Sequence, residues 1–299
     1  MAFVKAKREK VWLKILLSGA SGSGKSYSAL ILADAIAKQC GSRVAYIGTE
    51  GSRDKYYSDE FDYDLNQIED PYTTDKYMTA IQEAVDAGYK VLVIDSMSHE
   101  WKWLNDTHDK MQGNSFTNWG RLKPRHNLFM DKVLTSPIHI IATSRSKTDW
   151  LIEERNGKQV PKKVGTTQIQ DKEISYDYTV SLLLDQDTHV ASTDKDNTHL
   201  FDGRYDVITA ADGVKLWQWA NSGEAPAPMP KEKPQEEAFP EDELKSIKHD
   251  IIEMCKNLGG TQNENLMTVL KTYTPSGNPN VIKSIEKARE CLEAISKLA

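Results

Sequence analysis

The sequence has few cysteines and no long apolar run. Its three cysteines, Cys40, Cys255 and Cys291, lie far apart and form no C-x-x-C pair. Neither a disulfide framework nor a zinc site is therefore indicated. No stretch approaches the roughly 18 apolar residues that a membrane helix needs, and the charged amino terminus has no apolar signal segment. We expect a cytoplasmic protein with no membrane partner.

An overall excess of positive charge is also missing. The formal net charge is -6 over 299 residues, of which 27% are charged and 39% hydrophobic. These values are ordinary for a globular protein. A surface that binds a polyanion would have to be local, because distant charges are screened beyond roughly 10 Å. The length exceeds what one core usually supports, so one large domain and one smaller domain are expected.

Four short apolar runs have the length of buried strands: residues 11–18, 43–48, 90–95 and 138–143. Such runs are typical of parallel strands that are covered on both faces. Helical patterns separate them at residues 25–39, 74–87 and 116–134. This alternation predicts an α/β fold, a sandwich built on a mostly parallel sheet.

The carboxyl-terminal part of the large domain has shorter patterns. We predict antiparallel edge strands at 178–184, 189–193 and 198–201, and a closing helix at 215–220. Between 144 and 175 the apolar periodicity disappears, which predicts a loop.

A change in composition marks a domain boundary. Residues 222–243 contain five of the eleven prolines and seven acidic residues, as expected of a stiff, solvated linker. The predicted domains are therefore 1–221, the linker 222–243, and a small all-α domain at 244–299. In that domain, one helix ends at Gly259 and Gly260, a capping-box pattern at 261–264 opens a second, and 281–298 forms a third. These helices could bind a protein partner.

Residues 19–26 match the phosphate-binding pattern G-x-x-x-x-G-K-S/T, and they follow a predicted strand and open a predicted helix. In this context glycines let backbone N–H groups surround phosphates at a helix amino terminus. We predict ATP and Mg²⁺ as cofactors, with Lys25 on the β and γ phosphates and Ser26 on Mg²⁺. The predicted nucleotide contacts are Gly19, Ala20, Ser21, Gly22, Ser23, Gly24, Lys25, Ser26 and Tyr27.

Asp95 ends the third apolar run, so it should emerge at the carboxyl edge of the sheet and hold Mg²⁺ through water. Residues 43–48 lie between Lys25 and Asp95, which suggests that this strand is inserted between the P-loop strand and the metal-binding strand. ATPases with that layout carry a catalytic glutamate. Glu50 follows the inserted strand and is the favoured general base, and Glu100 is its competitor.

The segments YIGTEGSRDKYY at 46–57 and VLVIDSMSHEW at 91–101 resemble the core of the RecA recombinase family, especially the shorter Sak-type annealing and recombination ATPases of bacteriophages. The resemblance covers roughly residues 10–220. It implies a RecA-like P-loop NTPase in a three-layer sandwich, phage or prophage origin, single-stranded DNA as partner, and self-assembly into a ring or filament. It also implies Glu50 as the base and a γ-phosphate sensor at Thr143 or Ser144, although that family usually has glutamine there.

The segment 145–172 has seven basic residues against four acidic ones. A mobile loop with this excess could contact DNA phosphates, or it could be a solvated loop or hairpin of mixed charge. The resemblance suggests that Lys162 and Lys163 could also reach a neighbouring subunit's nucleotide. The candidate residues are Arg145, Lys147, Arg155, Lys158, Lys162 and Lys163.

Two other functions stay open. A P-loop kinase would pass the γ phosphate to a small acceptor and would not need Glu50. An adaptor would use the nucleotide as a switch and deliver a partner through its helical domain. Guanine specificity is disfavoured, because the near-match at 146–149 has serine where asparagine or threonine is required.

Overall fold

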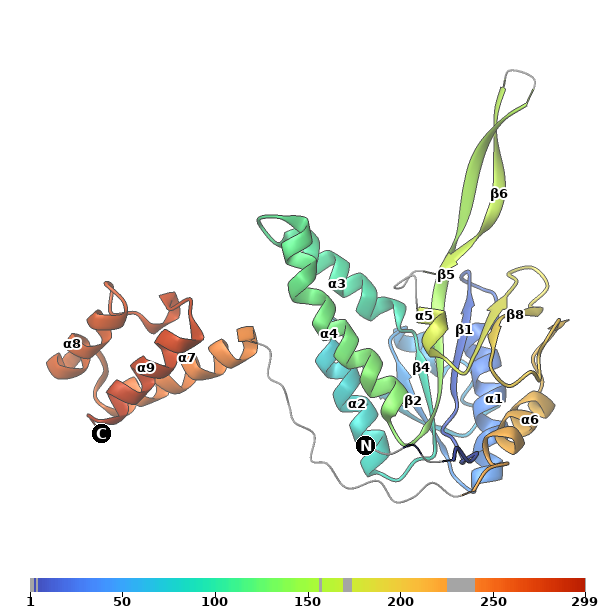
Figure 1. The fold of residues 1–299 in the computed structure, drawn as a ribbon, viewed down its shortest axis with the longest axis horizontal. Helices are drawn as coiled ribbons and strands as arrows, with labels where there is room; N and C mark the ends of the chain where they lie inside the picture. The colour runs from blue at the N-terminus through green and yellow to red at the C-terminus, as the bar shows by residue number, and fades with distance from the viewer. Residues whose placement is uncertain (1–2, 4, 156–157, 169–173, 225–239, 299) are drawn as a thin grey trace. The chain divides into compact units, whose positions relative to one another are not determined.

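The computed structural model describes residues 3, 5–155, 158–168, 174–224 and 240–298. The chain forms two compact units, Met1–Pro228 and Met229–Ala299. The sheet in the first unit has the strand order β3-β2-β4-β5-β1-β7-β8-β9 (Figure 1). These strands are β1 (Lys14–Gly19), β2 (Val44–Gly48), β3 (Tyr63–Gln67), β4 (Val91–Asp95), β5 (His139–Arg155), β7 (Val180–Leu184), β8 (Ala191–Asp196) and β9 (Tyr205–Asp206).

The pairings from β3 through β7 are parallel, whereas β8 and β9 pair antiparallel at one edge. Strand β4 shows why the sheet is covered on both faces, since all five of its residues are buried. Val91 and Val93 belong to one apolar cluster and Leu92 and Ile94 to the other, because successive strand residues point to opposite faces.

Helices α1 (Lys25–Cys40) and α6 (Ala210–Ala220) cover the first face. The second is covered by α2 (Thr74–Asp86) and α4 (Ser115–Thr135), with α3 (Ser98–Lys110) leading into α4. The predicted three-layer α/β sandwich with a mostly parallel sheet is therefore confirmed. Among the described residues, no helix is both long and apolar enough to cross a membrane.

The inserted strand is β5 and not the segment 43–48 as predicted. Strand β5 lies between β1 and β4, whereas β2 pairs with the far side of β4. Sequence order alone could not show this, because β5 comes later in the chain than both of its neighbours.

The predicted loop at 144–175 is wrong for much of its length, and the alternative of a hairpin is confirmed. Strand β5 continues past the sheet to Arg155 and pairs antiparallel with β6 (Lys158–Gln168). The resulting hairpin projects beyond the carboxyl edge of the sheet (Figure 1). A short helix, α5 (Ile174–Asp177), then returns the chain to β7.

Two elements in the last part of the first unit lie at other residues than predicted. Residues 198–201 form a turn, because the Asp196 carboxylate accepts hydrogen bonds from the backbone N–H groups of Thr198 and Phe201, each at 2.7 Å. The edge strand is instead β9. The closing helix begins at Ala210 and not at 215, because Thr209 and Asp212 form a capping box at its start.

The second unit contains α7 (Pro240–Asn257), α8 (Glu264–Tyr273) and α9 (Ile285–Ser296) around a small apolar core. Helix α8 is capped by Asn263, whose side chain accepts from Leu266 N, so the predicted capping box opening at 261 is wrong. Helix α9 begins at Ile285 because a 3-10 turn occupies Pro279–Val281. Most of the predicted linker, residues 225–239, lies outside the described residues.

Candidate functional site

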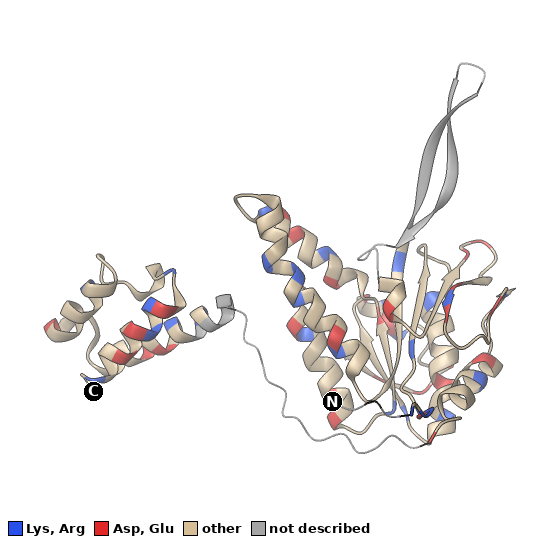
Figure 2. Ribbon diagram, viewed as in Figure 1, with Lys and Arg blue, Asp and Glu red and all other residues tan. Residues whose placement is uncertain are grey.

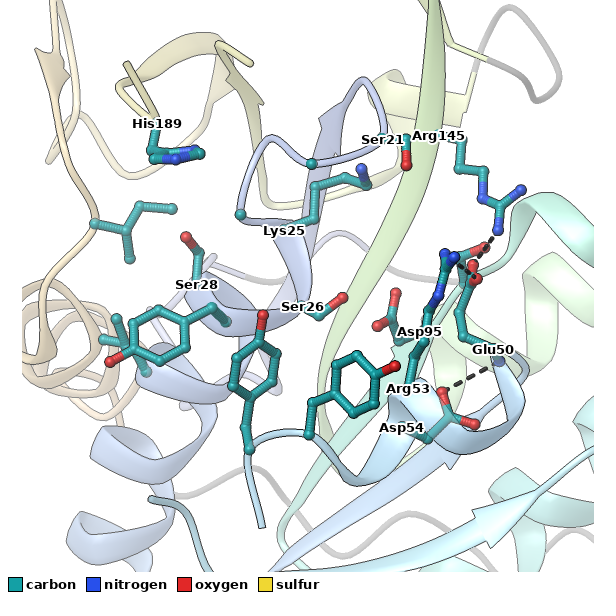
Figure 3. Close-up of a pocket in the computed structure, with 18 of the residues that line it drawn as sticks. Ser21, Lys25, Ser26, Ser28, Glu50, Arg53, Asp54, Asp95, Arg145 and His189 are labelled. Atoms are coloured by element: carbon teal, nitrogen blue, oxygen red, sulfur yellow. Dashed lines mark hydrogen bonds and ion pairs between the residues drawn. The ribbon is translucent and has the colours of Figure 1, made fainter. Parts of the chain in front are cut away.

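The carboxyl ends of the central strands border a cavity of about 690 Å³ (Figure 3). Four separate segments contribute five of the polar side chains that line it. They are Lys25 and Ser26 at the start of α1, Glu50 after β2, Asp95 at the end of β4, and Arg145 on β5. In α/β folds this edge of the sheet is where ligands bind.

The loop between β1 and α1 has the shape that the glycine pattern predicts. Gly22 and Gly24 have φ values of 82° and 83°, in the left-handed region that favours glycine. A Cβ on Gly19 would lie 2.4 Å from Ser23 Oγ and 2.8 Å from the carbonyl oxygen of Leu184, so only glycine fits there. The loop therefore folds tightly against the sheet while Ser21 and Gly22 stay exposed at the cavity.

The residues of this loop fit the phosphates of a nucleotide. The N-terminus of α1 has no side-chain cap, so its first backbone N–H groups are available to an anion. Ser23 Oγ is fully buried and has no hydrogen-bond partner among the described residues. A Cβ atom added at Gly22 would have no neighbouring atom within 4 Å, so the loop also leaves room for a ligand.

Lys25 is 8% exposed and its Nζ donates to the carbonyl oxygen of Ala20 at 2.7 Å. Burial lowers the pKa of Lys25, and the charge of Arg145 lowers it further, whereas Asp95 and Glu50 oppose the shift. A partly desolvated ammonium that is satisfied by one loop carbonyl can turn to phosphate oxygens, which carry more charge. This position agrees with the predicted contact to the β and γ phosphates.

Asp95 is 4% exposed, and both of its carboxylate oxygens accept hydrogen bonds from hydroxyl groups. Tyr46 Oη donates to Oδ2 at 2.6 Å, and Thr143 Oγ1 donates to Oδ1. Burial raises the pKa of Tyr46, so its hydroxyl keeps the proton that it donates. Each carboxylate oxygen retains a lone pair for water on Mg²⁺. Ser26 and Asp95 therefore fit the predicted Mg²⁺ contacts.

The two predicted sensor residues are buried on β5. Thr143 contacts Asp95, and Ser144 Oγ lies 3.4 Å from Ser98 Oγ. Both are fully buried, and neither borders the cavity. Thr143 is placed to orient the metal-binding carboxylate, and the sensor role of either residue stays a prediction.

Removing either hydroxyl group that donates to Asp95 should weaken Mg²⁺ binding. For Thr143→Val and Tyr46→Phe we expect the Mg²⁺ concentration for half-maximal binding of a fluorescent ATP analogue to rise about tenfold to hundredfold, as for other groups that orient metal ligands. Tyr89→Phe is the matched control, because its hydroxyl donates to Asp64 away from the cavity. An unchanged Mg²⁺ requirement in both variants would contradict this role.

Glu50 reaches the cavity, whereas its competitor Glu100 does not. Glu50 is 18% exposed at its side chain and forms an ion pair through Oε1 with Nη2 of Arg145. Glu100 is fully buried and lies 3.1 Å from Nδ1 of His126 on α4. Burial raises the pKa of Glu100, although His126 opposes the shift. The structure thus brings only Glu50 together with Lys25 and Asp95.

Sequence reasoning missed two residues beside Glu50. His99 Nε2 lies 3.9 Å from Glu50 Oε1, and its Nδ1 lies 2.7 Å from Thr49 Oγ1. Burial, and then the charge of Arg145, lower the pKa of His99. Arg53 Nη1 lies 3.9 Å from Glu50 Oε2. The basic Arg53 three residues after Glu50 was a signal in the sequence, but His99 is brought in by α3 and had none.

One side of the cavity is aromatic and apolar. Tyr27 was predicted as a nucleotide contact, and it borders the cavity with its hydroxyl donating to Glu60 at 3.0 Å. Its ring packs edge-on against Tyr57, with centroids 5.2 Å apart. The other members of this wall are Ile31, Tyr56, Val207 and Ile208. A flat apolar group such as a nucleobase suits this wall.

The six basic candidates on β5 and β6 fall into two groups. Arg145 borders the cavity and pairs with Glu50, so it does not belong to an outlying loop as predicted. The other five are on the hairpin strands, where their side chains lie outside the described part of the structure: Lys147, Arg155, Lys158, Lys162 and Lys163.

A comparison with curated proteins finds no match. Among solved structures, the chain is similar to a KaiC-like protein from the hyperthermophilic archaeon Pyrococcus horikoshii OT3. The identity is 16% and the TM-score 0.36, over 60% of this chain and 77% of that one.

The family model described as "AAA domain" matches residues 12–205. This span includes the phosphate-binding loop, Glu50, Asp95 and the hairpin. The family match and the strand order agree with the predicted RecA-like P-loop fold, in which a nucleotide-binding site is formed at the carboxyl edge of the sheet. The chain belongs to the AAA domain family.

Proposed function

We propose that the protein binds and hydrolyses Mg-ATP. The observation that carries this proposal is the presence of Glu50 in one cavity with Lys25, Ser26 and Asp95. When bound, Mg²⁺ neutralises charge on the β and γ phosphates. Lys25 and the N-terminus of α1 hold the phosphates, and Glu50 takes a proton from the attacking water or orients it. A kinase would not need a carboxylate to activate water.

We further propose that single-stranded DNA is the partner and that the β5–β6 hairpin contacts it. The hairpin sequence carries most of the local basic excess, and its strand β5 also forms part of the nucleotide site. Most of the described helices carry both basic and acidic residues, but α4 has four basic residues against Asp131 alone (Figure 2). We favour the hairpin over α4 as the DNA-binding element because its strand β5 also lines the nucleotide site.

The resemblance to RecA-type and Sak-type proteins supports a setting for this activity. It is recombination or annealing of phage or prophage DNA in the bacterial cytoplasm, by a ring or filament of this chain. An adaptor function is the second candidate, because the helices from Pro240 to Ser296 form a separate unit with its own core. Such a unit could hold another DNA-processing protein.

ATP hydrolysis by the purified protein, with and without single-stranded DNA at low and moderate salt, tests both proposals. We expect DNA to stimulate hydrolysis, and Lys25→Ala and Glu50→Gln to abolish the stimulated rate. The stimulation of hydrolysis by DNA should fall as the salt concentration rises. Contacts with DNA phosphates release counterions, and this release favours binding less at higher salt. If DNA neither binds at low salt nor alters turnover, the DNA assignment is wrong and the adaptor takes its place.

A further inference from the structure

Arg145 lies where the nucleotide site and the hairpin meet. The parallel register of β1 and β5 places Arg145 opposite Gly19, the first residue of the phosphate-binding loop. The next residue, Ser146, is opposite Gln168 and begins the pairing of the hairpin. Strand β5 is continuous through this point. Arg145 therefore stands on a strand that contributes to both parts.

The backbone of Arg145 is fixed, while its side chain turns into the cavity. Its N–H group donates to Ser98 Oγ at 2.8 Å. The guanidinium pairs with Glu50 and is 38% exposed, compared with 18% for the glutamate. Figure 3 shows the two side chains meeting at one side of the cavity, near Asp95. Arg145 can thus leave Glu50 by side-chain rotation without moving β5.

This ion pair opposes the role proposed for Glu50. A carboxylate oxygen that accepts from a guanidinium has less room to accept a hydrogen bond from water. Arg145 and Lys25 line the same cavity, and Arg145 lies opposite Gly19, the first residue of the phosphate-binding loop. A γ-phosphate held by Lys25 would therefore face Arg145 across this cavity. Guanidinium groups pair well with phosphate oxygens, often through two hydrogen bonds.

We propose that Arg145 exchanges its partner from Glu50 to the γ-phosphate when a triphosphate binds, which frees Glu50 to orient water. The inference rests on the proposed ATPase function and adds a step that regulates hydrolysis. With ADP there is no γ-phosphate, so Arg145 stays on Glu50. Arg145 then contributes, together with Lys25, to the discrimination of ATP from ADP, and it acts within its own subunit.

A double-mutant cycle on nucleotide binding tests the exchange without relying on turnover. Wild type, Arg145→Ala, Glu50→Gln and the double variant are titrated with Mg-ADP and with the non-hydrolysable β,γ-imido analogue of ATP, in the absence of DNA. In the Glu50→Gln background, Arg145→Ala should weaken analogue binding by about tenfold or more, the value of a charge-assisted contact. ADP binding should change little.

In the wild-type background the loss should be smaller, because Arg145 must first leave Glu50. Arg145→Lys should retain only part of the discrimination, since an ammonium lacks the planar fork. Arg43→Ala is the matched control, because Arg43 pairs with Asp62 and Asp64 away from the cavity. It should leave the ratio of the two affinities unchanged.

Two outcomes would overturn the inference and are distinguishable. If Arg145→Ala weakens ADP and the analogue equally, or weakens neither, in both backgrounds, Arg145 does not contact the γ-phosphate. The ATPase proposal survives that result. If wild type binds both nucleotides no better than Lys25→Ala does, the ATPase proposal itself fails, and the exchange fails with it.

Discussion

Glu50→Gln is expected to lower ATP hydrolysis by about 10²–10⁴-fold while ATP still binds. The amide keeps the size of the carboxylate but cannot take a proton from water. Glu50 is placed for this role because it borders the cavity that also holds Lys25 and Asp95. Phosphate release in the steady state measures the loss, and a fluorescent ATP analogue measures binding.

Glu100→Gln provides the matched control, because it makes the same change at the competing glutamate. Glu100 is fully buried against His126 and does not border the cavity. We expect hydrolysis near the wild-type rate in the folded protein and a lower free energy of unfolding, since the buried pair is altered. Loss of hydrolysis in Glu100→Gln, with Glu50→Gln active, would reverse the assignment of the base.

The parts of the site that were predictable are local in sequence. The phosphate-binding loop is one contiguous motif, and its glycines adopt the left-handed conformations that the motif requires. The four short apolar runs became β1, β2, β4 and the start of β5 because burial on both faces dictates their composition. Strand β3 was missed because it is an edge strand with the half-exposed sequence YDLNQ.

The sequence left a loop or a hairpin open here because the segment is polar. The part of β5 with the sequence SKTDWLIEER lacks the apolar run that marked the other strands. A signal was nevertheless present. Asn156-Gly157 lies between the end of β5 and the start of β6, and this dipeptide is typical of two-residue hairpin turns.

The contacts that control the site were not predictable from one sequence. Arg145 and Glu50 are 95 residues apart, and Asp95 is 49 residues from Tyr46 and 48 from Thr143. Each contact depends on the spatial order of β2, β4 and β5, which the chain order does not determine. Arg145 was therefore assigned to a DNA-binding loop on charge alone, whereas the register of β5 places it at the nucleotide.

Lys25→Ala is expected to weaken ATP binding by about hundredfold or more, because it removes charge-assisted hydrogen bonds to two phosphates. Nucleotide affinity, measured by calorimetry in the presence of Mg²⁺, gives the result. ADP binding should weaken less, since only the β phosphate contact is lost. Unchanged affinity for both nucleotides would mean that the loop does not hold phosphates and that the cavity binds something else.

Lys14 is a second buried lysine, and its substitution provides the control for the loss of affinity in Lys25→Ala. Lys14 is 4% exposed, and its Nζ donates to the carbonyl oxygens of Ser136 at 2.8 Å and Ile138 at 2.7 Å. Burial lowers the pKa of Lys14 to about 7. Lys14→Met removes the donor to both groups, and although Ser136 still accepts from Ile138 N at 2.8 Å, an unsatisfied carbonyl at Ile138 costs about 1–3 kcal/mol in unfolding free energy. Urea unfolding should show this fall in unfolding free energy. Tryptophan fluorescence follows the unfolding of the first unit, because all tryptophans precede residue 220.

Nucleotide affinity in Lys14→Met should stay at the wild-type value, because Lys14 begins β1 and the cavity lies beyond the other end of that strand. A fall in affinity in both lysine variants would mean that Lys25 acts through stability and not through phosphate.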